Sequence, residues 1–483
     1  MKRVAIKNKS FEKKSFPICI SIAFGYFLFR LLYFATHISF GVPPDEVTHF
    51  GICQVFSKTF LLPENSEETY SLGLVTNVPY LYYFIMGKFL KLNFFPISDL
   101  IFLRFLNCLL SFATVVFGYR WMRLITSDRI AQVLFVILIT NTPMFSFLGA
   151  AVSYDNLTNL FAVTGLYYLH LFLQNPNFNK FLLFGISLLG GALTKPAFLP
   201  LVLGYLGILM FHERNYLKSM FPLIKKSLFL LRHGQKLLLG ITLILLTFNL
   251  TLYLGNLIHF QKVVPNADQV LTEEEAMKSR IYARGRILSL YRSAEVTFEE
   301  AMRKAEKIES PGDRADTMIL LKIARAGSLK STPHLDRIQY AWPWMYGMLK
   351  RSVGIMGHHS MTKQSYWFSI YQLVFLFAFL LFVRYWKPSE SDYRLADAIS
   401  IVIFYAIILM QFVNYSAYAK SSSISLALQG RYLFPILIPF YGVIAYFLIH
   451  PFKVPVRIFI LLLISTVFIW GDFPYFLQNA TPP

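Results

Sequence analysis

The 483-residue sequence is poor in the residues and motifs that build several common kinds of site. Three cysteines, Cys19, Cys53 and Cys108, are too few and too scattered for a disulfide framework or a metal site. No Gly-x-x-x-x-Gly-Lys-Ser/Thr run occurs, which argues against an ATP-driven pump. Neither His-Glu-x-x-His nor Gly-x-Ser-x-Gly occurs, which argues against a zinc protease and an esterase. The chain also has no clear internal repeat.

Acidic residues are scarce, with 26 Asp and Glu against 46 Lys and Arg, so the formal net charge is +20. The basic residues gather in short polar stretches between apolar runs, a distribution that indicates membrane topology and not nucleic-acid binding. Six lysines and arginines precede the first apolar run, so we expect a cytoplasmic N-terminus. No small-residue cleavage site follows, so this run is predicted to be an uncleaved anchor.

Long apolar runs are abundant. Hydrophobic residues make up 55% of the chain and aromatic residues 17%, and the mean hydropathy is +0.51. Such runs cross a hydrocarbon layer about 30 Å thick as helices, because lipid offers the backbone no hydrogen-bond partners. The sequence therefore predicts an all-α, polytopic transmembrane bundle of about eleven spans, near residues 16–38, 101–119, 130–149, 156–174, 180–194, 197–211, 237–256, 366–384, 396–413, 431–449 and 457–471.

The run 78–92 is aromatic but short, and we interpret it as a helix in the outer interface. This single assumption keeps the later short basic stretches cytoplasmic. Residues 257–365 are polar and helix-prone, with capping-box spacings at Thr272 and Thr297, and are predicted to form a helical extracytoplasmic insert. The expected organisation is an N-terminal transmembrane region (1–256) with a catalytic first outer loop (39–100), the insert, and a C-terminal transmembrane region (366–483).

Two adjacent carboxylates and an imidazole follow the first span, in the segment Pro43–Phe50. Consecutive residues point about 100° apart on a helix, so Asp45 and Glu46 can play different roles, one as general base and the other in binding. His49 lies one turn beyond Asp45 and could orient it. The alternative is that the cluster only caps a surface helix, with Asp45 near the positive end of its dipole.

Two further polar signals are expected on the same side of the membrane. Asp155 lies at the outer end of the third crossing, where Ser153, Asp155 or Asn156 could also cap the following helix. Gln429, Arg431 and Tyr432 flank a glycine at the start of the tenth crossing, and a guanidinium there suits a phosphate head group. The alternative for Arg431 is an arginine that anchors the helix at the interface.

Three more cations, Lys88, Arg104 and Lys195, are predicted near the outer face. Each could neutralise the phosphate of a lipid-linked substrate. Lysines at helix ends also reach the interface without any functional role, so these residues are weaker candidates.

Four segments together give a family resemblance: Pro44–Phe50, Tyr154–Asn156, Leu193–Lys195 and Gln429–Pro435. With the topology, they resemble the GT-C superfamily of polytopic membrane glycosyltransferases, especially relatives of protein O-mannosyltransferases and aminoarabinose transferases. The resemblance implies a polyprenyl-phosphate sugar donor, inverting transfer on the outer leaflet and a base in the first outer loop. It makes Asp45 the catalytic candidate, Glu46 its neighbour in binding, and Arg431 with Lys88 the contacts to the donor phosphate.

The resulting hypothesis is an integral-membrane glycosyltransferase of the inner membrane that acts on a cell-envelope glycan, lipid or protein. We expect such an enzyme to need no cofactor; the alternative is a requirement for a divalent metal. A transporter or flippase for an envelope lipid is the alternative, since the same acids and cations could line a translocation path; however, transporters often carry internal repeats. A glycan polymerase or ligase would share the compartment and the partners.

Overall fold

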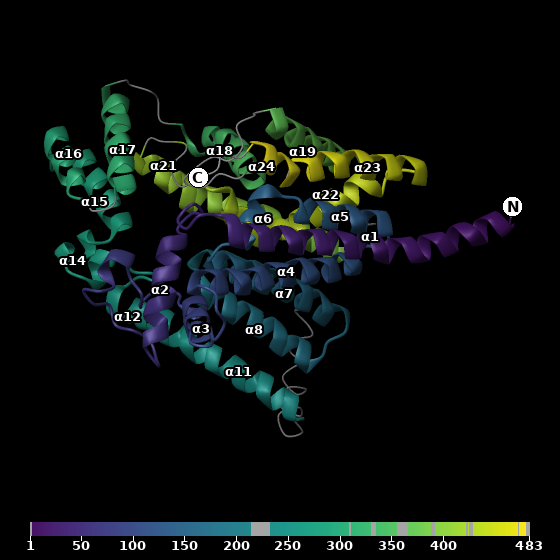
Figure 1. The fold of residues 1–483 in the computed structure, drawn as a ribbon, viewed down its shortest axis with the longest axis horizontal. Coiled ribbons are helices and arrows are strands. Elements are labelled where there is room, and N and C mark those ends of the chain that lie inside the picture. Colours follow the sequence, from purple (N-terminus) through teal and green to yellow (C-terminus); the bar gives the residue numbers. More distant parts are fainter. Residues whose placement is uncertain are drawn as a thin grey trace.

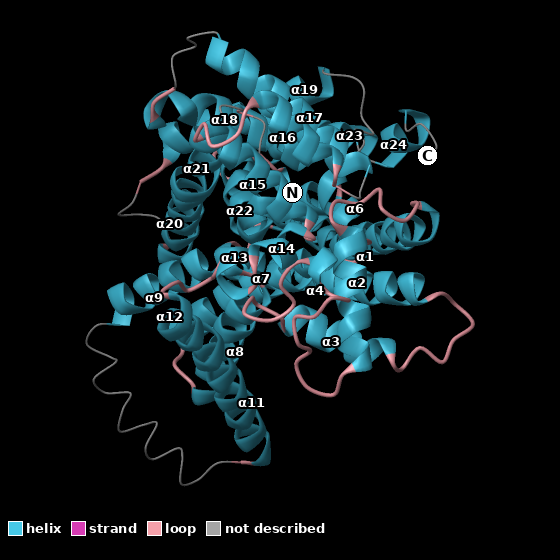
Figure 2. Ribbon diagram, turned by 90° about the vertical axis from the view of Figure 1, so that its left-hand side faces the viewer, coloured by secondary structure: helices cyan, strands magenta, loops and turns pink. Residues whose placement is uncertain are grey.

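The computed structural model describes residues 2–213, 232–308, 311–329, 335–354, 366–387, 392–421, 424, 428–471 and 473–479. Within these ranges the regular elements are helices, and no strand occurs (Figure 2). The basic stretch that includes Arg214 and Lys218, part of the topology argument, lies outside the described residues.

The long helices run side by side along one direction (Figure 1). In the first half, α7 packs against α8 and α4, and α11 packs against α8; in the second half, α22 packs against α5, α19 and α20. Their bounds are α1 Lys2–His37, α4 Asp99–Ile125, α5 Arg129–Thr140, α7 Tyr154–Gln174, α8 Phe178–Thr194, α9 Leu199–Glu213, α11 His233–Asn249, α19 Tyr366–Tyr385, α20 Tyr393–Ile408, α22 Leu437–Ile449, α23 Val454–Gly471 and α24 Phe473–Asn479.

Seven helices in the described ranges are long and apolar enough to cross a membrane, or eight if a bent pair counts as one span. That pair is α5 with α6 (Pro143–Gly149), which meet at 63°. The polytopic helical prediction is therefore confirmed, whereas the number eleven stays a prediction. The expected spans 156–174, 180–194 and 197–211 coincide with α7, α8 and α9, of which α8 and α9 are shorter apolar helices.

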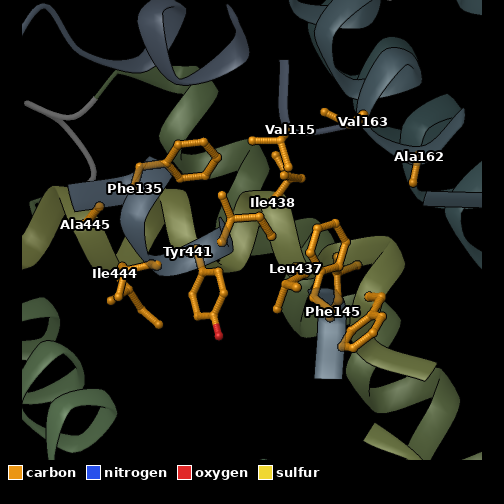
Figure 3. Packing of buried hydrophobic residues seen from close by; sticks show 14 of the residues in the cluster. Val115, Phe135, Phe145, Ala162, Val163, Leu437, Ile438, Tyr441, Ile444 and Ala445 are labelled. Carbon is orange, nitrogen blue, oxygen red and sulfur yellow. The ribbon is translucent and has the colours of Figure 1, made fainter. Parts of the chain in front are cut away.

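The centre of the bundle is filled by interlocking aliphatic and aromatic side chains. Ile438 and Tyr441 of α22 lie among Val115 of α4 and Phe135 of α5 (Figure 3). A Cβ at Gly118 would lie 2.6 Å from the Ile438 Cδ1, so the small residue allows α4 and α22 to approach. Because lipid tails are as apolar as these side chains, close packing supplies the attraction between the helices.

Two short helices lie at the end of the bundle that also carries the insert, which we call the insert end (Figure 1). They are α2 (Glu46–Lys58) and α3 (Leu81–Leu90), joined through the short 3₁₀ turn η1 (Tyr70–Leu72). With ten residues α3 is about 15 Å long, half of a hydrocarbon layer. This length agrees with the interpretation of 78–92 as a helix that does not cross.

The insert holds a small core of its own, in which Ile287, Ala301 and Leu321 pack together. Its helices are α13 Ala267–Val270, α14 Glu273–Met277, α15 Arg280–Arg292, α16 Phe298–Glu306 and α17 Pro311–Leu329. Thr272 and Thr297 form the capping boxes that their spacing predicts. The next helix, α18 (Arg337–Val353), differs, because its Tyr340 and Met348 belong to the core of the main bundle.

The remaining described elements join these helices. Two spans contain π-helical turns: η3 (Leu250–Leu254) links α11 to α12 (Gly255–Phe260), and η4 (Leu409–Asn414) links α20 to α21 (Tyr415–Ser421). Two 3₁₀ segments lie where the chain re-enters the bundle, η2 (Pro196–Phe198) before α9 and η5 (Gly430–Ile436) before α22. The segment η2 directly follows Lys195, and η5 contains Arg431 and Tyr432.

Candidate active site

Asp45 stands at the junction between a buried Pro43-Pro44 pair and α2. Its backbone is left-handed, with φ 60° and ψ 8°, a conformation that Asp and Asn adopt more readily than other non-glycine residues. Its side chain makes no capping bond to α2, so the simple capping alternative is not what the structure contains. The carboxylate is 31% exposed and points instead toward two arginines.

The first of these arginines is Arg431, whose guanidinium forms an ion pair with Asp45 Oδ2. Its Nη1 donates to the carbonyl of Pro44 at 3.3 Å, and its Nε donates to Gln429 Oε1 at 2.6 Å. The side chain is only 3% exposed. Arg431 is therefore fixed against the segment that presents Asp45, although 386 positions separate the two residues.

Gly430 explains how Arg431 reaches this place. A Cβ on Gly430 would lie 2.2 Å from the backbone carbon of Arg351 and 2.2 Å from the backbone nitrogen of Ser352. No side chain fits between η5 and the end of α18, so only glycine permits this approach. Gly430 thus allows η5 to pack directly against the backbone of α18.

Asp155 and Lys195 complete the buried part of the cluster. Lys195 Nζ donates to Asp155 Oδ1 and lies 4.6 Å from the ring centroid of Tyr154 and 5.0 Å from that of Tyr432. Asp155 Oδ2 lies 3.8 Å from Arg431 Nη1. The capping alternative also holds here, because Ser153 Oγ accepts a bond from the Asp155 backbone N–H at 3.2 Å.

His49 lies under this cluster on the first turns of α2. Its Nδ1 is 2.8 Å from the Tyr83 hydroxyl, and its ring packs edge-on against Tyr154. Its Nε2 is buried and has no hydrogen-bond partner among the described residues. Burial lowers the pKa of His49 to about 4, and Arg431 and Lys195 act in the same direction, so the ring is neutral near pH 7.

The charges around Asp45 decide its protonation state. Burial raises the pKa of this carboxyl, but the attraction and hydrogen bond of Arg431, together with the attraction of Arg280, outweigh it, so the pKa lies well below its usual value. Asp45 is therefore an ionised carboxylate that remains partly accessible. Such a group can accept a proton once a nearby cation moves away from it.

Glu46 lies in a different environment from its neighbour. It is fully buried, and Arg104 donates to it through Nε and Nη2 at 2.8 and 2.6 Å. The backbone N–H of Val152 also donates to Glu46, and Arg104 Nη1 reaches the carbonyls of Ala35 and Ile38. These bonds tie α2 to α4 and to the end of α1, which gives Glu46 and Arg104 a structural place beside the site.

Lys88 is not brought into the cluster. Its ammonium donates to the carbonyls of Phe56 and Thr59, at the C-terminal end of α2. Asp45 lies at the opposite end of this 13-residue helix, roughly 20 Å away at 1.5 Å per residue. Of the ten predicted site residues, the structure gathers Asp45, His49, Asp155, Lys195, Gln429, Arg431 and Tyr432, with Glu46 and Arg104 adjoining them.

Three residues of this network were not predicted from the sequence: Arg280, Thr48 and Asp313. Arg280, the first residue of α15, lies 3.5 Å from Asp45 Oδ1 through its Nη2, which also donates to Thr48 Oγ1 at 2.9 Å. Its Nη1 lies 3.3 Å from Asp313 Oδ2 of α17. Nothing near Arg280 in the sequence distinguishes it from the other arginines of the insert.

In the described part of the chain, no group of three His, Cys, Asp or Glu side chains is arranged to hold a metal ion.

Part of the chain is similar to a known family of membrane enzymes. A model of the dolichyl-phosphate-mannose-protein mannosyltransferase family matches residues 77–232. An oligosaccharyltransferase of Archaeoglobus fulgidus, solved in complex with Zn and sulfate, is 13% identical with a TM-score of 0.46, over 96% of this chain. The chain spans about half of that enzyme, 53% of its length. A search of curated proteins finds no match.

Proposed function

We propose that this chain is a membrane glycosyltransferase of the GT-C type that uses a polyprenyl-phosphate sugar as donor. The acceptor is a cell-envelope glycan, lipid or protein. The observation that carries the proposal is the environment of Asp45, a partly exposed carboxylate held between two guanidiniums at one end of an apolar bundle.

The reaction that suits this site is a direct displacement. Asp45 accepts the proton of the acceptor hydroxyl, whose oxygen forms a bond to the anomeric carbon of the donor. The bond from that carbon to the phosphate oxygen breaks, and its electron pair leaves with the polyprenyl phosphate. The products are the inverted glycoside and polyprenyl phosphate, with the proton on Asp45 until water removes it.

The cations of the cluster have a role in this displacement. The leaving phosphate gains negative charge as the bond breaks, and fixed cations stabilise it without having to reorganise. Arg431 and Lys195 are buried and held in place by Asp155, so their charges are already oriented. His49 is neutral, which leaves it available to accept or donate a hydrogen bond through Nε2.

The proposed setting follows from the charge pattern. We place the N-terminus in the cytoplasm, because basic residues precede the first span, and the insert end outside the inner membrane. A donor with a lipid tail then lies between the helices while its head reaches the cluster. Glu46 and Arg104 support the site in this proposal by holding α2 in place.

The test is sugar transfer by purified protein. Protein in detergent or vesicles is given labelled polyprenyl-phosphate sugar and an envelope extract, and the release of polyprenyl phosphate is measured. Asp45→Asn should reduce turnover by about 10²- to 10⁴-fold, because it removes the base. Asn tolerates the left-handed backbone, so the variant should keep its fold.

Asp99→Asn, on the exposed first turn of α4, is the matched control and should keep wild-type turnover. Full turnover in Asp45→Asn would refute the mechanism. Movement of the lipid across vesicles without any sugar transfer would favour a flippase instead.

A further inference from the structure

Charge within the cluster is balanced before any substrate binds. Three cations, Arg280, Arg431 and Lys195, face three carboxylates, those of Asp45, Asp155 and Asp313. An anionic donor that enters this site must draw a cation away from a carboxylate, since an unpaired phosphate would not be neutralised. The question is which cation moves.

The two arginines on Asp45 differ in how firmly they are held. Arg431 is 3% exposed and engages Asp45, Gln429 and the Pro44 carbonyl at once. Arg280 is 25% exposed and lies 3.5 Å from the Asp45 carboxylate; its other contacts, to Thr48 and Asp313, do not involve Asp45. A partly exposed pair at that distance costs far less to separate than a buried one. Arg280 is therefore the cation that can leave Asp45.

The segment that leads into the helix of Arg280 is anchored independently of this pair. Glu275 of α14 accepts a bond from the Tyr70 hydroxyl at 2.8 Å, and Lys278 lies 3.0 Å from Glu67. Both Tyr70 and Glu67 belong to the segment between α2 and α3. The insert is thus docked on the same segment that follows α2, and the Arg280 side chain can move while its backbone stays in place.

We infer that Arg280 is the donor-phosphate residue contributed by the insert: its guanidinium passes from Asp45 to the phosphate when the donor binds, and this exchange frees Asp45 Oδ1 to act as base while Arg431 stays on Oδ2. The inference rests on the proposed function and gives the insert a role in it. Asp45 becomes a better proton acceptor only after Arg280 has bound the donor phosphate, because a nearby positive charge favours the ionised carboxylate. An acceptor that enters first meets an occupied Asp45.

The test compares donor and acceptor kinetics in Arg280→Ala, Arg280→Lys and a control, Arg286→Ala. Arg286 lies on the same helix and pairs with Glu273 on the surface of the insert. Arg280→Ala should raise the donor KM about tenfold while the acceptor KM stays unchanged, since one charge-assisted contact to phosphate is lost. Arg280→Lys keeps the positive charge but lacks the two-pronged guanidinium, so its donor KM should fall between those of the wild type and Arg280→Ala. Added methylguanidinium should restore donor binding in Arg280→Ala, a response that a purely structural role would not give.

Binding of polyprenyl phosphate alone provides a second measurement that needs no turnover. Arg280→Ala should bind it about tenfold more weakly than Arg286→Ala. If the wild type transfers sugar and Arg280→Ala keeps both its donor KM and its affinity for polyprenyl phosphate, the inference is overturned and the proposed function stands. If the wild type transfers no sugar, the proposed function fails, and the inference fails with it.

Discussion

Glu46 and Arg104 form a two-pronged ion pair inside the bundle, although 58 positions separate them in the chain. Both side chains are almost fully buried, and the backbone of α1 and the Val152 N–H complete their hydrogen bonds. Asp45, one residue before Glu46, is instead partly exposed and faces the insert. Two adjacent carboxylates thus lie in different environments, and their substitutions should have different effects.

Glu46→Gln should lower stability, because it leaves the Arg104 guanidinium buried without its counter-charge. Breaking a buried pair in this way typically costs about 3–5 kcal/mol. Thermal unfolding in detergent would measure the change. Glu67→Gln, which removes one side of an exposed pair with Lys278, is the control and should change the unfolding temperature little. Equal unfolding temperatures for the two variants would contradict the structural role of Glu46.

Gly430→Ala should affect both stability and turnover. The added methyl meets the backbone of α18, which cannot rotate away as a side chain could. Overpacking of this kind costs about 1–3 kcal/mol and should shift Arg431 away from Asp45. Gly240→Ala on α11, where nothing lies within 4 Å of the new methyl, should leave turnover intact. Unfolding curves and sugar transfer by the two variants would check this; normal transfer by Gly430→Ala would show that the contact is dispensable.

The buried His49 should make stability fall on mild acidification. Burial lowers its pKa to about 4 in the folded protein, whereas the unfolded chain takes up the proton near the usual value of 6.5. Between these two values the unfolded state binds more protons, so stability is fully present above 6.5 and is lost as the pH decreases toward 4. The loss should reach about 3 kcal/mol.

The charged groups that act on His49 are Asp45, Asp155, Arg431 and Lys195, and the Asp45 carboxyl has a lowered pKa, so it titrates below this window. His49→Gln should therefore show a shallower loss between pH 6.5 and 4 in thermal unfolding. Identical pH profiles for the variant and the wild type would refute the assignment.

Much of the site could be predicted because its residues follow local rules. A carboxylate after a proline pair, an acid at a helix start and a Gly-Arg step each stand out in a mostly apolar chain, and the structure brings Asp45, Asp155 and Arg431 together. Apolar runs likewise predicted the helices, because lipid offers no hydrogen-bond partners and the backbone must form its hydrogen bonds within each helix.

The remaining features depend on contacts that the sequence does not encode locally. The partner of Glu46, Arg104, lies two helices further along the chain, so the buried ion pair could not be predicted from the sequence around Glu46. Lys88 and Lys195 were both predicted near the outer face. The structure separates them, because the carbonyls at the C-terminal end of α2 bind Lys88 far from Asp45. Arg280 is one of many arginines in the insert, and only the docking of α14 beside Tyr70 brings it to the site.

Asp45 and Arg431 are 386 positions apart in the chain, and this separation has a consequence for biogenesis. At roughly 5–20 residues per second, a ribosome makes the arginine about 20–80 s after the aspartate. During that interval a membrane-inserted fragment carries the carboxylate without its guanidinium. Two separately expressed halves, divided within the insert, would each lack a competent centre and would gain one on association.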